Sequence, residues 1–437
     1  MANYFVSKSG NDSNAGTATG APKLTIDSAW QAVAEGDSII ILDSGTYSGS
    51  DNTDLSSRNI DNITIEADDG THSGAVQSPI IDGGGSAAYF VRFDENYTFR
   101  RLKFQSFATG DNGILTHRTT VGLTTLTITD CEFRNSTGQI LDLDQVDTLT
   151  TIERCQFYNN SAPNTGTTSS QVNSGTNRII IKNCLFYNIG PRNQNFNLID
   201  SRNDNTSITH CTFAKRDTTV SNPAQPYRLF RIGGGDFKYN ILYEFDASNE
   251  TILATAGGDV QYNSYGNDSS ISGSWSGSAG PVNGVTPSNN ITLTTDPGFV
   301  SYTGNDYRLK YTARSIALDA ASGSTETVDI TNRNRLTLDK LQYDSGILDM
   351  GCYESNFWTP ESPELIPQIG SDFTINRYSN VQTQWNRATP SGPDTPAGAP
   401  NNVELLPFSV SVNGSIPTLI RQRPGAYTLV TGGKKEG

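Results

Sequence analysis

A four-residue phrase, with cysteine second and phenylalanine fourth, recurs along the middle of this 437-residue chain. Its cysteines are separated by 24, 29 and 27 residues, and weaker copies upstream and downstream bring the total to seven. Internal repetition with a period of roughly 20–50 residues is typical of solenoids and related arrays. The four full phrases are Asp130-Cys131-Glu132-Phe133, Arg154-Cys155-Gln156-Phe157, Asn183-Cys184-Leu185-Phe186 and His210-Cys211-Thr212-Phe213, and the weaker copies are Arg101-Leu102-Lys103-Phe104, Asn240-Ile241-Leu242-Tyr243 and Asn263-Ser264-Tyr265.

Short alternating stretches precede each phrase, such as Thr127-Ile128-Thr129 and Val91-Arg92-Phe93. Period-two alternation puts the outer residues of each triplet on one face of a strand and the middle residue on the other. No repeat contains a helix-length periodic segment, so each coil is predicted to hold two or three short strands. The apolar set AVILMFWYC makes up only 35% of the chain, which fits a thin continuous core with polar turns. The sequence therefore predicts an all-β, single-stranded parallel β-helix.

Stacked coils would align the four phrase cysteines in one inward column, with the four phenylalanines in a second. Neighbouring coils lie about 4.8 Å apart, which leaves disulfides sterically possible. Five cysteines are an odd number, and no CxxC spacing occurs, so we interpret them as free, buried, small apolar residues rather than as disulfides or a zinc site.

A short amphipathic segment lies close to the N-terminus. Ile26, Ala29, Trp30 and Val33 fall on one helical face, and Thr25 stands where an N-cap would be. The open end of a β-helix exposes strand edges that invite pairing. We therefore expect a capping helix over about residues 25–34.

These features resemble the right-handed parallel β-helix of the pectate-lyase-like superfamily over about residues 3–355. The words that carry the resemblance are Tyr4-Phe5-Val6-Ser7, Gly10-Asn11-Asp12, Gly16-Thr17, Gly36-Asp37-Ser38-Ile39, Gly45-Thr46-Tyr47, Asp296-Pro297-Gly298-Phe299-Val300, Asp306-Tyr307-Arg308-Leu309 and Leu348-Asp349-Met350-Gly351-Cys352-Tyr353-Glu354. The resemblance implies the fold, but it leaves activity open, because one fold hosts lyases, hydrolases, epimerases and non-enzymes.

The chain divides into four predicted regions. Residues 1–50 form the N-terminal strand and capping helix, and residues 51–290 form the coils. Residues 291–355 close the β-helix. Residues 356–437 hold 10 of the 19 prolines and are interpreted as an arm or small β subdomain for attachment or oligomerisation, with a disordered tail as the alternative.

The charge and hydropathy of the chain exclude some classes of binding partner. A net charge of −14 disfavours nucleic acid and anionic membrane surfaces, both of which bind basic proteins. No apolar run approaches the roughly 18 residues of a membrane helix. Met1-Ala2-Asn3 leads directly into a strand pattern, without the basic and apolar regions of a signal peptide. We expect a protein that acts without Sec export; removal of a signal would instead indicate an extracellular protein.

One outward row of residues carries the best candidate chemistry. In stacking order it runs through Arg92, Thr116, Asp142, a position near Asn173, Asp200 and Arg231. Asp142 and Asp200 would lie about 9.6 Å apart at about 4.8 Å per coil. Inverting glycoside hydrolases use a carboxylate pair separated by about 6.5–9.5 Å. The alternative is an ordinary solvated face, where charges are common.

A lyase would instead need a cation and a base. Asp142, Asp144 and Asp147 could supply oxygen ligands to Ca²⁺, with Arg202 or Arg231 as the base. No other cofactor is predicted. His210 takes the turn slot that Asp130, Arg154 and Asn183 fill in other repeats, so we expect it to face outward. Tyr158, Tyr187 and Tyr243 are either sugar-stacking residues or corner residues of the core.

Two hypotheses follow. The first is a structural protein of a bacteriophage particle, a capsid-decoration or tailspike-like β-helix made in the host cytoplasm. It would form a homotrimer, bind other virion proteins through residues 356–437 and contact surface polysaccharide. The tailspikes that share this fold resemble one another in carrying an N-terminal particle-binding domain, which has no counterpart ahead of Tyr4. The second hypothesis is a polysaccharide lyase or hydrolase acting through Asp142, Asp200 and Arg231.

Overall fold

The structure is a computed structural model that describes most of residues 1–354 and, beyond them, five strands between residues 373 and 430. The gaps before residue 354 are 56–57, 59, 94, 111, 118–124, 144–148, 162–168, 191–195, 217–227, 244–250, 255–257, 262, 267–290, 294–296, 310–316, 319, 333–334 and 336–347.

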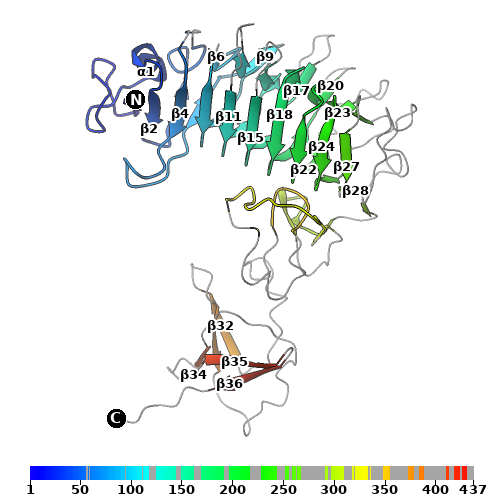
Figure 1. Cartoon of the computed structure of the whole chain (residues 1–437). Helices are drawn as coiled ribbons and strands as arrows, with labels where there is room; N and C mark the ends of the chain where they lie inside the picture. Colours follow the sequence, from blue (N-terminus) through cyan, green and yellow to red (C-terminus); the bar gives the residue numbers. More distant parts are fainter. Residues whose placement is uncertain are drawn as a thin grey trace, which may run out of the picture.

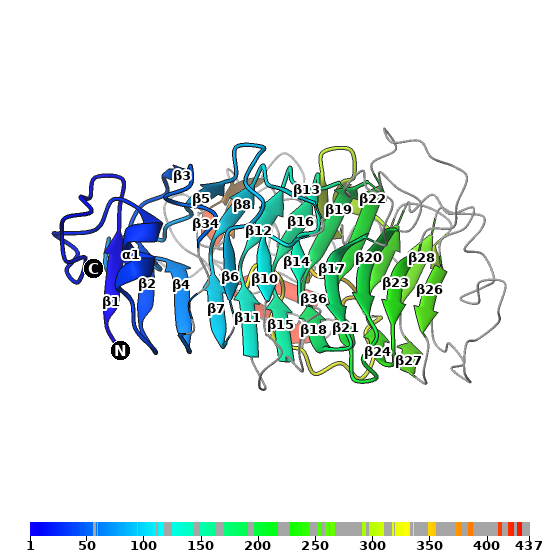
Figure 2. The ribbon, with the colours of Figure 1, turned by 90° about the horizontal axis from the view of Figure 1, so that it is seen from above.

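Three parallel sheets run side by side along the molecule and form a right-handed β-helix (Figures 1 and 2). Sheet A consists of β1 (Asn3–Val6), β2 (Ser38–Ile41), β4 (Ile63–Ala67), β7 (Tyr97–Arg100), β11 (Thr125–Thr129), β15 (Leu149–Glu153), β18 (Arg178–Lys182), β21 (Ser207–Thr209), β24 (Gly235–Lys238) and β27 (Gly258–Gln261). Sheet B consists of β3 (Thr46–Ser48), β5 (Ile80–Asp82), β8 (Lys103–Gln105), β12 (Glu132–Arg134), β16 (Gln156–Tyr158), β19 (Leu185–Ile189), β22 (Thr212–Arg216), β25 (Ile241–Tyr243), β28 (Ser264–Gly266) and β29 (Ile291–Leu293). Sheet C consists of β6 (Val91–Phe93), β10 (Leu115–His117), β14 (Leu141–Asp142), β17 (Ser169–Gly175), β20 (Phe196–Ser201), β23 (Arg228–Ile232) and β26 (Thr251–Ala254).

The core is built from columns of identical or similar side chains, because adjacent coils pair in register. Phe104, Phe133, Phe157, Phe186 and Phe213 stack with ring centroids 4.6–5.0 Å apart, and all are buried. The predicted phenylalanine column is therefore confirmed. Each ring lies over the next coil's ring, which joins successive coils by continuous apolar contact.

The cysteine column is also confirmed. Cys131, Cys155, Cys184 and Cys211 are free and buried, and each thiol donates to a backbone carbonyl, as Cys131 Sγ does to Thr129 O at 3.3 Å. The column then continues as asparagine. Asn240 Oδ1 accepts from Cys211 N at 2.9 Å, and Asn240 Nδ2 donates to Asn263 Oδ1 at 3.0 Å.

The N-terminal end carries the predicted cap. Helix α1 (Ile26–Ala32) begins after Thr25, whose Oγ1 accepts from Ser28 N at 3.2 Å. Ile26, Ala29 and Trp30 are buried against the first coil, which covers the end of the core. No helix in the described ranges has the length and apolar character needed to cross a membrane.

In six successive coils the chain turns from sheet A to sheet B through one residue with a left-handed backbone. We call these residues the turn ridge: Arg101, Asp130, Arg154, Asn183, His210 and Tyr239, with φ between 52° and 62°. A left-handed conformation is unfavourable for residues with a Cβ. It is supported here because the ridge amides donate to the next coil, as His210 N does to Lys238 O at 3.2 Å.

The remaining elements lie outside the three main sheets. Residues 320–332, Arg335 and 348–354 pack on the ridge side of the later coils, and we call them the clasp. The other strands are β9 (Ala108–Gly110), β13 (Thr137–Gly138), the antiparallel pair β30 (Phe299–Ser301) and β31 (Asp306–Leu309), and β32 (Phe373–Arg377), β33 (Thr383–Arg387), β34 (Val410–Val412), β35 (Thr418–Arg423) and β36 (Ala426–Val430). The rest of the predicted arm, residues 356–437, lies outside the described residues.

Candidate functional site

The predicted outward row exists as one register line on sheet C. The strand pairings align Arg92 with Thr116, Thr116 with Asp142, Asp142 with Asn173, Asn173 with Asp200, and Asp200 with Arg231. Asp142 and Asp200 are therefore two coils apart, with one amide residue between them. This is the placement that the alternation of the sequence predicts; the catalytic roles remain a hypothesis.

Asp142 is half-buried and held by amide donors. Its Oδ1 accepts from Gln139 Nε2 at 3.2 Å and from Asn173 Nδ2 at 3.4 Å. The backbone around it is closely packed, because a Cβ on Gly113 would lie 2.4 Å from Asp142 N. The carboxylate is thus fixed in orientation along the row by neutral hydrogen bonds.

Asp200 is buried and paired with a cation. Arg202 Nε lies 3.3 Å from Asp200 Oδ1, and Arg202 Nη2 lies 3.3 Å from Oδ2. The Asp200 side chain is 3% exposed, whereas that of Arg202 is 46% exposed. The guanidinium contacts both carboxylate oxygens, so this charge-assisted pair holds the Asp200 side chain in place.

The other predicted participants are only partly placed. Arg231 pairs with Asp200 through the backbone of β23, but its side chain lies outside the described part of the structure. Asp144 and Asp147 also lie outside it, so the proposed calcium site of Asp142, Asp144 and Asp147 stays a prediction. Among described residues, no group of three or more His, Cys, Asp or Glu side chains is arranged to hold a metal ion.

The candidate sugar-stacking tyrosines have other contacts. Tyr243 is buried at 5% exposure and belongs to the core beneath the clasp. Tyr158 and Tyr187 stack on each other with centroids 4.8 Å apart and planes 8° apart, and Tyr187 also contacts Tyr307. Because each ring presents one flat face to the other, this pair offers less free surface for a sugar than two separate rings would.

Sequence reasoning missed the polar junction between the ridge and the clasp. Arg335 is fully buried, and its guanidinium donates to Asn183 Oδ1 at 2.8 Å, to Glu354 Oε2 at 2.8 Å and to Gly351 O at 2.9 Å. The expectation that His210 faces outward at its turn position is wrong. The clasp covers this residue, which is only 1% exposed. The sequence showed that the ridge residues occupy equivalent turn positions in successive repeats, but it did not show that the clasp packs on some of them.

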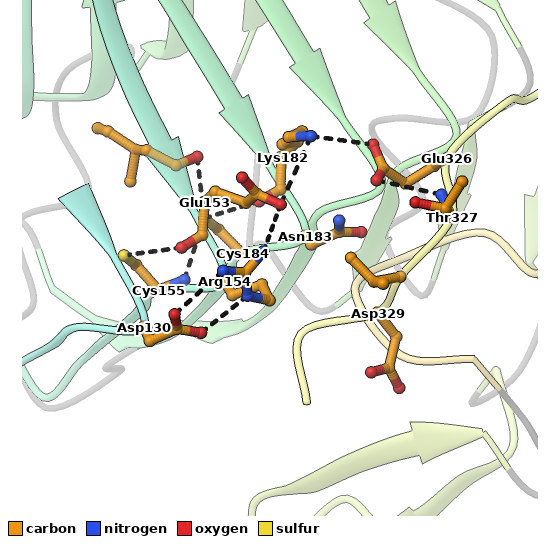
Figure 3. Close-up of polar contacts among 12 residues, drawn as sticks. Asp130, Glu153, Arg154, Cys155, Lys182, Asn183, Cys184, Glu326, Thr327 and Asp329 are labelled. Carbon is orange, nitrogen blue, oxygen red and sulfur yellow. Dashed lines mark hydrogen bonds and ion pairs between the residues drawn. The ribbon is translucent and has the colours of Figure 1, made fainter. Parts of the chain in front are cut away.

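A row of alternating charges links the ridge to the clasp (Figure 3). Arg154 pairs with Asp130 at 2.8 Å and with Glu153. Lys182 Nζ then lies 3.5 Å from Glu153 Oε1 and 3.5 Å from Glu326 Oε2 of the clasp. The acidic and basic side chains therefore alternate across three coils, which limits repulsion in an acidic chain.

Comparison with known proteins gives matches at the level of structure alone. No family model and no curated protein matches the chain. The structure is similar to that of the pectate lyase Pel9A, with 15% identity, a TM-score of 0.44, and coverage of 82% of this chain and 97% of that one. It is also similar to a rhamnogalacturonan lyase, with 13% identity, a TM-score of 0.30, and coverage of 80% and 100%. Neither likeness bears on activity. The three parallel sheets and their register show that this chain is a right-handed parallel β-helix.

Proposed function

We propose that this chain is a structural protein of a bacteriophage particle, a β-helical capsid-decoration or tailspike-like protein that acts as a homotrimer. The observation that favours a non-catalytic role is the bonding of the sheet C row. Asp142 accepts from two amides and Asp200 pairs with Arg202, so both carboxylates are bonded to neighbouring side chains of the β-helix itself. The polar outer faces suit a protein that works in water as a rigid rod.

The virion assignment rests on the sequence. The proline-rich residues 356–437 supply a segment of the chain for anchoring to other virion proteins. The net charge of −14 favours protein or sugar partners over nucleic acid. On this proposal the chain is made in the host cytoplasm, becomes part of the particle, and presents the β-helix to surface polysaccharide.

Truncation tests this proposal. A chain ending at residue 355 should keep the far-ultraviolet spectrum of a β-helix but should lose its trimeric mass in light scattering and its binding to particles. The matched control is a full-length chain with Asp236→Asn, a change on sheet A far in sequence from the arm. A truncated chain that is still trimeric and still binds particles would refute the anchoring role.

The second candidate is a polysaccharide lyase or inverting glycoside hydrolase on sheet C. The observation that favours it is the two-coil separation of Asp142 and Asp200, about 9.6 Å at about 4.8 Å per coil, with Asn173 between them. Calcium at Asp142, Asp144 and Asp147 and a basic role for Arg231 belong to the lyase version of this candidate.

Activity assays on a panel of neutral and acidic glycans separate the two candidates. Cleavage that is abolished by Asp142→Asn and by Asp200→Asn, but not by Asp236→Asn, would establish the enzyme. Added EDTA would then distinguish a calcium-dependent lyase from a hydrolase. Binding to a glycan without cleavage would favour the structural protein.

A further inference from the structure

The clasp covers only the later half of the turn ridge, and His210 lies at the centre of that contact. His210 Nε2 is 2.6 Å from Ser324 Oγ, and the ring stacks on Tyr239 with centroids 4.9 Å apart. The clasp continues on both sides of this point. Tyr239 Oη donates to Ser322 O at 3.1 Å, and Cys352 N donates to Thr212 Oγ1 at 3.1 Å.

The surroundings of His210 suit a neutral imidazole. Its Nδ1 is buried and has no hydrogen-bond partner among the described residues. Burial, followed by the nearby positive charge of Arg335, lowers the pKa of His210 well below its ordinary value. A protonated ring would place a second buried cation beside Arg335.

Two of the carboxylates at this contact are paired with cations. Glu354 accepts from Arg335, and Glu326 pairs with Lys182. Asp329 Oδ1 accepts from the backbone and hydroxyl of Thr331. The charged and titratable groups at the contact are Lys182 from β18, Tyr239 from the ridge, and Glu326, Asp329, Arg335, Asp349 and Glu354 from the clasp.

We propose that the clasp is an acid-released cover, in which protonation of His210 detaches the clasp from the turn ridge while the β-helix stays folded. Release would uncover an apolar part of the outer face of sheet B, where Leu185, Ala214, Ile241 and Tyr243 are buried together with Leu348, Met350 and Cys352. The same chain would thus present a polar surface at neutral pH and an apolar one in acid.

The direction follows from linkage. His210 has a lower pKa under the clasp than when exposed, so the clasp is fully stabilised above the ordinary histidine pKa of about 6.5. Below that pH the released form binds a proton that the closed form excludes. The opening equilibrium therefore rises by about tenfold per pH unit until the pKa of the covered ring is reached.

Thiol reactivity reports opening directly. Burial raises the pKa of the Cys352 thiol to about 12, so this cysteine of the clasp is protected in the closed form. The other four cysteines lie within the β-helix and react only when it unfolds. With 4,4′-dithiodipyridine, which reacts in acid, the full-length protein should release no thiopyridone at pH 7.5 and one equivalent per chain at pH 5.0. Cys352→Ser should abolish that signal.

His210→Gln supplies the decisive variant, because an amide can bond Ser324 but does not titrate. It should keep Cys352 protected at pH 5.0, whereas the control His72→Gln, which changes an exposed histidine, should open like the parent protein. Protection of Cys352 in the parent at pH 5.0 would overturn the proposal. So would reactivity of His210→Gln at the same pH as the parent.

A second measurement does not depend on the variant folding. The chain has only three histidines, so labelled imidazole Cε1–H resonances are few enough to follow through a titration. The His210 resonance should shift over the same pH interval in which Cys352 becomes reactive. Titration of His210 with Cys352 still protected would refute the coupling.

Discussion

The two halves of the turn ridge have the same backbone but opposite surroundings. Arg101, Asp130 and Arg154 stay partly exposed and form ion pairs with neighbouring coils. Asn183 and His210 share the left-handed conformation, with φ of 54° and 52°, yet are buried beneath the clasp. The comparison shows that the residue type at each ridge position matches its exposure. A solvent-exposed charge costs little folding free energy, whereas a buried charge needs a dedicated partner.

The largest expected effect comes from Arg335→Met. Removing the guanidinium leaves the Glu354 carboxylate and Asn183 Oδ1 without their buried donor, which should cost about 3–5 kcal/mol of clasp closure. Cys352 should then react at pH 7.5, at least 100-fold faster than in the parent.

The comparison variant is Arg101→Met, in the half of the ridge that the clasp does not cover. The ion pair of Arg101 with Glu66 is partly exposed, so its loss should cost about 0–1 kcal/mol of stability. Equal labelling rates in the two variants would mean that burial does not separate the two halves.

A smaller effect is expected from Gly351→Ala. At this residue φ is +88°, and an added Cβ would lie 2.6 Å from Thr212 Oγ1 and 2.7 Å from Ile241 Cδ1. Backbone strain and overpacking together should weaken the clasp by about 2–3 kcal/mol. Gly84→Ala is the matched control, since its φ is +60° and nothing lies within 4 Å of its Cβ. Gly84→Ala should therefore lose stability through backbone strain alone, by about 1 kcal/mol. Differential scanning calorimetry and Cys352 labelling of both variants measure the difference, and equal losses would argue against the close contact.

The smallest effect is expected from Glu326→Gln. It breaks the 3.5 Å pair with Lys182, the last link of the charge row, but both side chains touch solvent. Clasp closure should weaken by less than about 1 kcal/mol, and 0.5 M NaCl should remove most of the difference. Labelling of Cys352 at two salt concentrations tests this. A salt-independent loss of several kcal/mol would mean that this ion pair behaves like the buried contacts of Arg335 rather than like the partly exposed ion pairs of Arg101, Asp130 and Arg154.

The sequence carries the β-helix in local, repeated signals. The Cys and Phe columns, the row from Arg92 to Arg231 and the helix after Thr25 could all be predicted, because each depends on strand alternation or on spacing within one coil. In-register stacking then copies the same contact from coil to coil. The placement of Asp142 and Asp200 two coils apart could be predicted from strand alternation and in-register stacking alone.

The clasp could not be predicted in this way. Arg335 and Asn183 are 152 residues apart in sequence, and nothing periodic relates them. The sequence by itself determined the coil, its columns and the polar row on sheet C, because these follow from a repeat of fixed length. Only the tertiary structure decided which ridge residues are buried, that His210 is covered, and that Asp200 pairs with Arg202. Those outcomes depend on how a non-repeating segment or a single side chain packs, and burial sets the cost of each charge.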